Sequence, residues 1–442
     1  MKLKTVVATI SLLTAAAAVT ASADSLAALN AKVDALQKQV SSLNSGSSSS
    51  AAGNLVRFNA AASEMMLNNQ GGVNRELGLL KARQKGTVAN GTVTLGGQAQ
   101  MDAIYSHVNQ AANAKYSNVQ SNSTGNKNAS HLVVSHLDLD AIAAVNSWTT
   151  VYADFGVANI GNKSTTASTG VQLNQGYLLL GNLSQSPIYG FMGKKSLDFG
   201  SFQTVNIYFA PMNRELFGSA VGNQVGVGYD SHGFNTTLTV MNGKQMSQNW
   251  NVPFSGATTQ TFSTTNPSQI GTDTNNANQI NNFALNATYG MNSNGVDWNV
   301  GAGYLNGTAF TANNSDGTAK SSSRNGAWDL NANVSVAKFT VLAEYTATTK
   351  RTVIGTGAAK KLSAWNLGGM YSFPLMGKKS DVSLSYSAAK YDNTNSQWTA
   401  GFRNETFKNV WMGLEYNYAK TQVSTANDAK VSSLVFDVRT FF

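Results

Sequence analysis

The residues best suited to chemistry are charged side chains in and around a glycine- and aromatic-rich segment. Lys194 and Lys195 follow Gly193, Asp198 lies just before Phe-Gly, and Arg214 follows in a stretch without a period-2 pattern. The aromatic residues of this stretch make it too apolar to prefer water. We therefore predict that residues 196–220 fold inward and place these four charges at a constriction. The alternative is a solvated loop packed on its neighbours.

A second charged group follows the polar face of segments in which apolar and polar residues alternate. Its members are Asp102, Asp138, Asp140, Asp154, Glu344 and Glu415. If these carboxylates line one narrow space as an acidic wall, a basic segment opposite them would create a transverse field that sorts solutes by size and charge. Pairing of the carboxylates with neighbouring Lys or Arg is an equally compatible arrangement.

Motifs for making or breaking covalent bonds are missing from the sequence. The four histidines have no metal-ligand spacing such as HExxH, and there is no cysteine, GxSxG motif or P-loop. The glycines at 222–228 lie within a strand pattern, where they would relieve crowding rather than cradle a phosphate. We expect neither enzyme activity nor a metal site or cofactor.

The elements that must position the charges are β-strands. From Thr92 to Phe442 the sequence keeps a period-2 alternation in sixteen segments of about 9–11 residues, a length that spans a membrane as a tilted strand. Short and long connections alternate between them, as in outer-membrane barrels. The pattern predicts an all-β membrane protein, with a 16-stranded antiparallel outer-membrane β-barrel at 92–442.

The last residues of the sequence have the alternating pattern of the closing strand of such a barrel. Leu434, Phe436, Val438 and Phe442 share one face, while Asp437 and Arg439 share the other. We predict that Phe436, Val438 and Phe442 act as an assembly signal for the barrel assembly machinery. Tryptophans near strand ends predict an interfacial girdle: Trp148, Trp298, Trp328, Trp365, Trp398 and Trp411.

The N-terminal residues predict export from the cytoplasm and a helix that joins subunits. Residues 1–23 have the charged start, apolar middle and small-residue site of a signal peptide. Residues 24–44 predict a short periplasmic coiled coil that would make a homo-oligomer, such as a trimer; the alternative is one amphipathic helix packed on its own domain. Residues 45–54 form a flexible linker, and 55–91 a periplasmic or pore-mouth segment. The coiled-coil seam would be Leu26, Leu29, Val33, Leu36, Val40 and Leu43.

Charge and composition restrict the partners. The formal charge is +9, and removal of Lys2 and Lys4 with the signal peptide leaves +7. The basic residues are dispersed, so we expect no nucleic-acid partner. The expected partners are outer-membrane lipids and small anionic solutes, and the expected location is the outer membrane of a Gram-negative bacterium.

Two short segments give the chain a resemblance to a known family. These are residues 74–84, which begin Asn-Arg-Glu-Leu-Gly, and the pair Gly193-Lys194-Lys195 and Asp198-Phe199-Gly200. Together with the predicted architecture, they resemble the outer-membrane siderophore porins typified by the legiobactin receptor and by iron-uptake porins of Francisella. The resemblance implies uptake of a ferric siderophore without a plug domain, and it assigns no ligand-binding residues.

The sequence leaves more than one function open. The first hypothesis is passive uptake of small anionic or chelated nutrients, with a ferric siderophore as the named case. A general or phosphate-type anion-selective porin is the alternative. An adhesin or phage-binding barrel that uses the long loops at 242–280 and 306–325 is a second alternative.

Overall fold

The computed structural model describes residues 55–68, 70–109, 127–158, 170–218, 221–242, 280–308, 310, 324–352, 359–390, 394–421 and 428–442. The chain divides into two units, Met1–Val56 and Arg57–Phe442, and the second contains the barrel. The predicted signal peptide, the coiled-coil seam and the linker at 45–54 lie outside the described residues.

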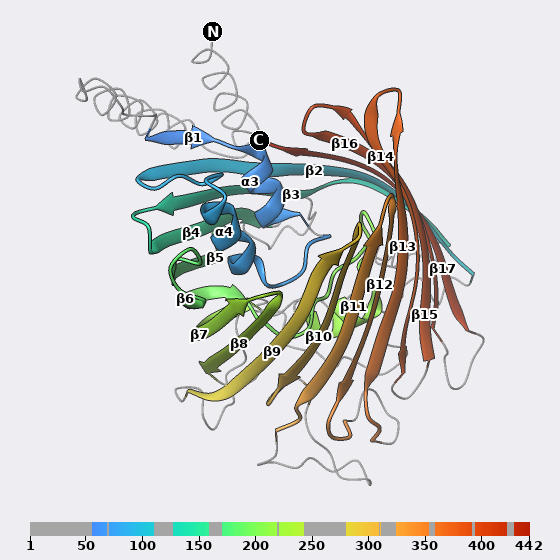
Figure 1. The fold of residues 1–442 in the computed structure, drawn as a ribbon. Coiled ribbons are helices and arrows are strands. Elements are labelled where there is room, and N and C mark those ends of the chain that lie inside the picture. Colours follow the sequence, from blue (N-terminus) through green and yellow to red (C-terminus); the bar gives the residue numbers. More distant parts are fainter. Residues whose placement is uncertain are drawn as a thin grey trace. The chain divides into compact units, whose positions relative to one another are not determined.

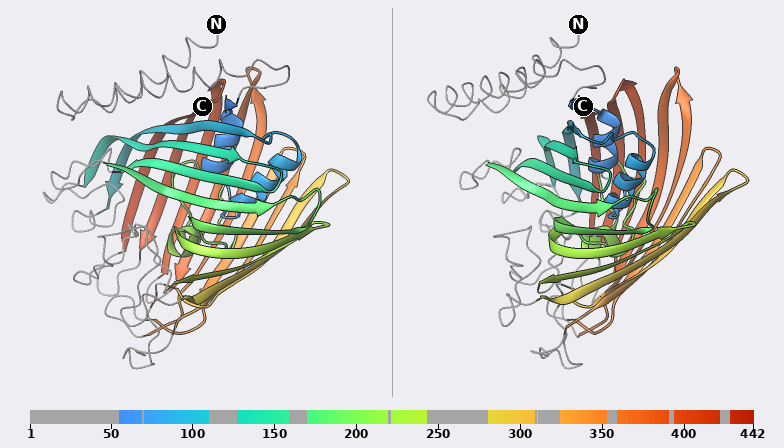
Figure 2. Two further views of the ribbon diagram at one scale, coloured as in Figure 1. Left: turned by 90° about the vertical axis from the view of Figure 1, so that its left-hand side faces the viewer. Right: turned by 60° about the vertical axis from the view of Figure 1, so that its left-hand side comes forward.

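Sixteen antiparallel strands form a closed barrel (Figure 1, Figure 2). Each of these strands pairs with the next along the chain, and the last pairs with the first, so the sixteen barrel strands form a closed ring. The predicted 16-stranded barrel is confirmed. The strands are β2 (Thr92–Val108), β3 (Asn128–Ala144), β4 (Thr149–Ala158), β5 (Gly170–Gly181), β6 (Ile188–Ser196), β7 (Val221–Ser231), β8 (Phe234–Asn242), β9 (Ile280–Ser293), β10 (Val296–Leu305), β11 (Ala327–Val336), β12 (Phe339–Thr348), β13 (Ser363–Leu375), β14 (Lys378–Lys390), β15 (Thr394–Phe407), β16 (Val410–Thr421) and β17 (Ala429–Phe441).

Side chains alternate between the two faces of the barrel wall. On β17, Leu434 and Phe436 are exposed on the outer face, whereas Val435, Asp437 and Arg439 are buried inside. The same alternation leaves apolar side chains exposed along the outer face of every barrel strand from β2 to β17. An apolar outer face with a polar inner face is what a bilayer demands of a barrel, because lipid cannot solvate polar side chains.

Aromatic rings gather near both ends of the strands. Trp411 was predicted among them, and this prediction is wrong. Its side chain is only 8% exposed and lies on the inner face, under the Arg403 guanidinium at 4.5 Å, because it shares the parity of Glu415. The outer ring pairs include Tyr289–Trp298 and Phe339–Tyr371 near the short turns, and Trp328–Tyr345 and Trp365–Tyr386 near the longer connections. These two belts match an interfacial girdle.

Tight turns join the strands at one end of the barrel. In His232-Gly233, Asn294-Gly295 and Met376-Gly377 both residues have positive φ, the conformation of the type I′ hairpin. The opposite end carries the longer connections. Outer-membrane barrels have the same arrangement, with their short turns on the periplasmic side.

Glycines of β7 make room for rings inside the barrel. A Cβ atom at Gly226 would lie 2.2 Å from the Phe191 ring, and one at Gly228 would lie 2.1 Å from the Tyr189 ring. The predicted role of these glycines, relief of crowding, is therefore confirmed.

Two short helices occupy the barrel mouth on the side of the short turns. After β1 (Val56–Phe58) come α3 (Ala60–Leu67) and α4 (Arg75–Gln84), which begin at the capping residues Asn59 and Asn74. Their apolar faces pack on inward side chains of β3 to β6, and Arg83 donates to the carbonyl of Asn146 in a short turn. Of the two predicted places for residues 55–91, the pore mouth is the one observed. None of the described helices is long and apolar enough to cross a membrane.

The C-terminal residue closes the barrel. The Phe442 N–H donates to the Gly97 carbonyl at 3.1 Å, and the Gly97 N–H donates back at 2.9 Å. A Cβ atom at Gly97 would lie 2.8 Å from the Phe442 ring, so the ring packs directly over this glycine. The Ser63 hydroxyl of α3 lies 3.2 Å from the Phe442 carbonyl and 2.8 Å from Asp140 Oδ1, which ties the helix to the seam.

We expect Phe442→Asp to reduce strongly the amount of folded barrel in the outer membrane, because it replaces the ring over Gly97 with a charge and removes the predicted assembly signal. Heat-modifiable electrophoretic mobility of membrane fractions measures this amount. Phe407→Asp is the matched control, since Phe407 is an exposed ring that ends another strand, β15. Equal losses in both variants would contradict a special role for the last residue.

Candidate functional site

The segment after β6 folds into the barrel. Its side chains Phe199, Phe202, Ile207 and Phe217 are all buried, and it includes a short π-helix, η2 (Arg214–Gly218). Its backbone contacts inward side chains of β12, β14 and β16. The predicted infolding is thus confirmed for the described part, residues 197–218.

Glu344 holds the first part of the segment. Its carboxylate accepts hydrogen bonds from the N–H groups of Ser201 at 2.7 Å and Phe202 at 2.9 Å, and from the side-chain amide of Asn213 at 2.8 Å. This carboxylate is on β12 and faces inward, as predicted. It is 5% exposed, so its contacts are with the segment rather than with solute.

Glu415 holds the middle of the segment in the same way. It accepts hydrogen bonds from the N–H groups of Ile207, Tyr208 at 3.1 Å and Phe209 at 2.6 Å. The neighbouring Arg439 donates to the Ile207 carbonyl at 3.2 Å. A hydrogen bond contributes about 0.5–1.5 kcal/mol, and each of these two carboxyl groups accepts from three groups of the segment, so together they are strong anchors.

A tight local turn lets the segment reach Glu344. Gly200 has φ of 73° and Phe202 has φ of 52°, both in the left-handed region. A Cβ atom at Gly200 would lie 2.8 Å from the Phe202 ring and 3.0 Å from the Asp329 carboxyl carbon. Glycine is needed at 200 for both reasons, and the buried Phe202 ring holds a backbone conformation that non-glycine residues rarely adopt.

An ion cluster fastens the start of the segment to α4. Lys195 Nζ lies 2.6 Å from Asp198 Oδ1 and 3.1 Å from Glu76 Oε2, and 4.3 Å from the centre of the Phe191 ring. The three charged residues are 0–1% exposed. Burial and the nearby Glu76 raise the pKa of the Asp198 carboxyl well above its usual range, although Lys195 acts in the opposite direction.

Lys195 and Asp198 were predicted at a constriction, and the structure buries them in this cluster, without access for a solute. Sequence reasoning missed Glu76 as their partner. A signal was present, because Glu76 and the pair Lys195 and Asp198 belong to the two short segments of the family resemblance. The structure brings those segments into contact.

The two remaining constriction candidates lie outside the ion cluster: Lys194 is on β6, and Arg214 is on the infolded segment. Lys194 is half-buried and donates to the Leu173 carbonyl. Arg214 donates to the Phe202 carbonyl at 3.2 Å, and burial lowers the pKa of its guanidinium to about 10. Their contact with a solute stays a prediction.

The predicted acidic wall exists as a row of inward carboxylates. Asp140 lies opposite Asp154 in the β3–β4 register, and Asp102 lies opposite Asp437, which sequence reasoning did not include. The four predicted aspartates contact neutral side chains and one histidine. Asp102 accepts from Gln100 and Ser135, and Asp138 contacts Gln98, Asn174 and His136. Asp140 accepts from Ser63, and Asp154 accepts from Asn174. The four predicted aspartates form no ion pair with Lys or Arg among the described residues.

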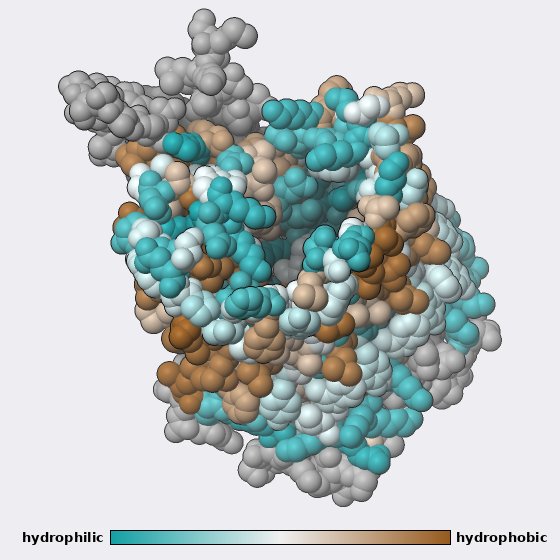
Figure 3. Space-filling view, in the orientation of Figure 1, coloured by the Kyte–Doolittle hydropathy of each residue, from teal (hydrophilic) through white to brown (hydrophobic). Residues whose placement is uncertain are grey.

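Opposite the helices, the barrel wall is polar and mostly uncharged. Figure 3 shows a hydrophilic hollow at the mouth of the barrel where the two helices lie. Half-buried inward side chains of β9 to β14 include Thr288, Asn299, Asn333, Ser335, Thr340, Ser372 and Ser383. In the part of the chain that the structure describes, no group of three or more His, Asp or Glu residues is arranged to hold a metal ion.

Comparisons with known proteins identify the fold. No family model and no curated protein matches the chain. Many solved structures match it, among them the outer membrane channel DcaP of Acinetobacter baumannii, with 14% identity, 79% of this chain and 97% of that chain covered, and a TM-score of 0.51. OprB of Pseudomonas putida matches with 10% identity, 78% of this chain and 94% of that chain covered, and a TM-score of 0.53. An anion-selective porin from Comamonas acidovorans matches with 12% identity, 79% of this chain and 99% of that chain covered, and a TM-score of 0.51. The chain has the fold of the outer-membrane porins.

Proposed function

We propose that this protein is a passive channel for small hydrophilic solutes in the outer membrane of a Gram-negative bacterium. One observation carries the proposal: a closed barrel with an apolar outer face encloses a polar interior, which an anchored segment narrows. Diffusion through such a lumen needs only weak contacts with the solute, so that the solute can also leave.

We propose further that the preferred solutes are anionic or chelated nutrients. The support is the charge of +7 after signal removal, with Lys194 and Arg214 on or beside the infolded segment. One structure with the same fold is described as an anion-selective porin, which is a property of that protein. The row of aspartates opposes this preference, so ion selectivity is the quantity to measure.

We expect zero-current potentials across a bilayer in a potassium chloride gradient to have the sign of chloride preference. The double variant Lys194→Gln, Arg214→Gln should move them toward zero, because it removes two positive charges near the lumen. Lys378→Gln, Lys379→Gln is the control at the exposed end of β14. Cation preference in the wild type would contradict the charge argument.

Uptake of a ferric siderophore is the finer proposal, supported by the resemblance of residues 74–84 and 193–200 to siderophore porins. A chelate larger than the remaining hollow would have to displace α3 and α4 or the infolded segment. A strain lacking the gene should then grow more slowly on siderophore-bound iron than the parent strain, and equally on phosphate- or sugar-limited medium. Equal growth on every iron source would leave only the general channel.

Oligomer formation belongs to the same proposal. Residues 24–44 would join the subunits, and the mass of the detergent-solubilised full chain, compared with a chain lacking these residues, measures the association. An unchanged mass would place the contacts elsewhere or exclude them.

A further inference from the structure

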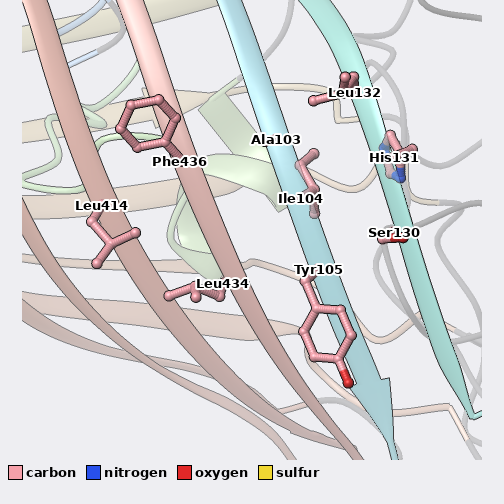
Figure 4. A pocket seen from close by; sticks show the side chains of 9 residues that line it. All are labelled: Ala103, Ile104, Tyr105, Ser130, His131, Leu132, Leu414, Leu434 and Phe436. Carbon is pink, nitrogen blue, oxygen red and sulfur yellow. The ribbon is translucent and has the colours of Figure 1, made fainter.

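An apolar groove crosses the outer face of the barrel over β16, β17, β2 and β3 (Figure 4). Its volume is about 520 Å³. In the strand register Ala103 lies between Phe436 and Leu132, so a small side chain forms the floor between two large ones. The groove is also lined by Leu414, Leu434, Ile104, Tyr105, Ser130 and His131. An open, apolar groove of this volume suits a flexible hydrocarbon chain.

Two lysines lie on the outer face at the loop end of the same strands. Lys420 and Lys430 are opposite each other in the β16–β17 register, and Lys430 is on the face of Leu434 and Phe436. Asp428 lies 2.7 Å from Lys420, so among the described residues the two lysines keep a surplus of positive charge.

The aromatic belt sets the depth of both features in the membrane. Tyr105 and Tyr416 flank Leu434 in the register, and such rings mark the interface between headgroups and hydrocarbon. Lys430 is four residues beyond Leu434 toward the loops, about 14 Å at the rise of a strand. The lysines therefore lie at the headgroup level of the outer leaflet, and the groove lies at the hydrocarbon level.

We propose that this surface binds a phosphorylated lipid of the outer leaflet, with its phosphate against Lys420 and Lys430 and an acyl chain over Ala103. The positive surplus above an apolar groove carries this assignment, since an uncharged lipid would use the groove alone. The inference rests on the location of the barrel in a membrane and not on the transported solute.

The test is native mass spectrometry of the purified full chain in neutral detergent. Dioleoyl phosphatidic acid and dioleoylglycerol serve as probes because they differ only in the phosphate. Phosphatidic acid should bind about tenfold more tightly, and Lys420→Gln, Lys430→Gln should remove about that factor. The control Lys378→Gln, Lys379→Gln should leave binding unchanged. Equal binding of the two lipids, or equal binding by both double variants, would overturn the proposal.

A second pair of variants tests the groove. Ala103→Phe should fill it and weaken binding of phosphatidic acid, whereas Ala103→Ser should bind like the wild type, with heat-modifiable mobility as proof that each barrel has folded. Because the chain has no cysteine, Ala103→Cys also reports whether a second copy occupies the groove. A disulfide-linked dimer formed efficiently in membranes, or full binding by Ala103→Phe, would contradict the lipid assignment.

Discussion

The double variant Glu344→Ala, Glu415→Ala is expected to raise single-channel conductance severalfold and to broaden the range of solutes that pass. These carboxyl groups accept hydrogen bonds from the N–H groups of Ser201, Phe202 and residues 207–209, at about 0.5–1.5 kcal/mol for each hydrogen bond. Without them the infolded segment loses its attachment to β12 and β16. Current steps in planar bilayers measure the effect.

Two control variants make this result specific to the anchors. Glu344→Gln, Glu415→Gln keeps one acceptor oxygen at each position, so its conductance should lie between those of the wild type and the alanine variant. Glu405→Ala removes a carboxylate that accepts from the N–H of Asn409, outside the segment, and this variant should conduct like the wild type. An alanine double variant with unchanged conductance would show that the segment does not narrow the channel.

Lys195→Met is expected to lower the free energy of unfolding at neutral pH by about 3–5 kcal/mol, because it leaves Glu76 and Asp198 buried without their cation. Lys194→Met is the matched control, since it removes the same charge from a half-buried neighbour. Urea unfolding of the barrel in lipid vesicles measures both. Adding Glu76→Gln and Asp198→Asn to Lys195→Met should recover much of the loss. A similar loss in both single variants would contradict a special role for the buried cluster.

The deficit of Lys195→Met should depend on pH. Burial already raises the folded-state pKa of Asp198, and loss of the lysine raises it further. A carboxyl with a raised folded-state pKa contributes stability below its unfolded pKa and loses that contribution as the pH rises through the folded value. The difference between variant and wild type should therefore shrink from neutral pH toward pH values of about 4, the ordinary range of Asp and Glu. A constant difference would point to lost packing on Phe191 instead.

The strands were predictable because alternation is local and repeated. On β17, Leu434 and Phe436 alternate with Val435 and Asp437, and the faces follow from parity alone. Trp411 shows why closeness to a strand end is not enough to predict that an aromatic ring belongs to the girdle. Its parity with Glu415 places it inside, and a check of that parity would have removed it from the girdle.

The candidate site was only partly predictable. The inward direction of Glu344 and Glu415 followed from alternation, but their partners are backbone N–H groups whose positions depend on the turn at Gly200 and Phe202. The contact between Glu76 and Lys195 joins residues more than a hundred positions apart, and local patterns carry no such information. Both charged groups were recognised, whereas the contacts that bury them became visible only in three dimensions.

Single-channel recording of the purified wild-type chain in planar bilayers tests the central claim most directly. A barrel narrowed by an anchored segment should give small, discrete and long-lived current steps whose size grows in Glu344→Ala, Glu415→Ala. Absence of such steps from protein shown to be folded by its heat-modifiable mobility would contradict the assignment of this barrel as a channel.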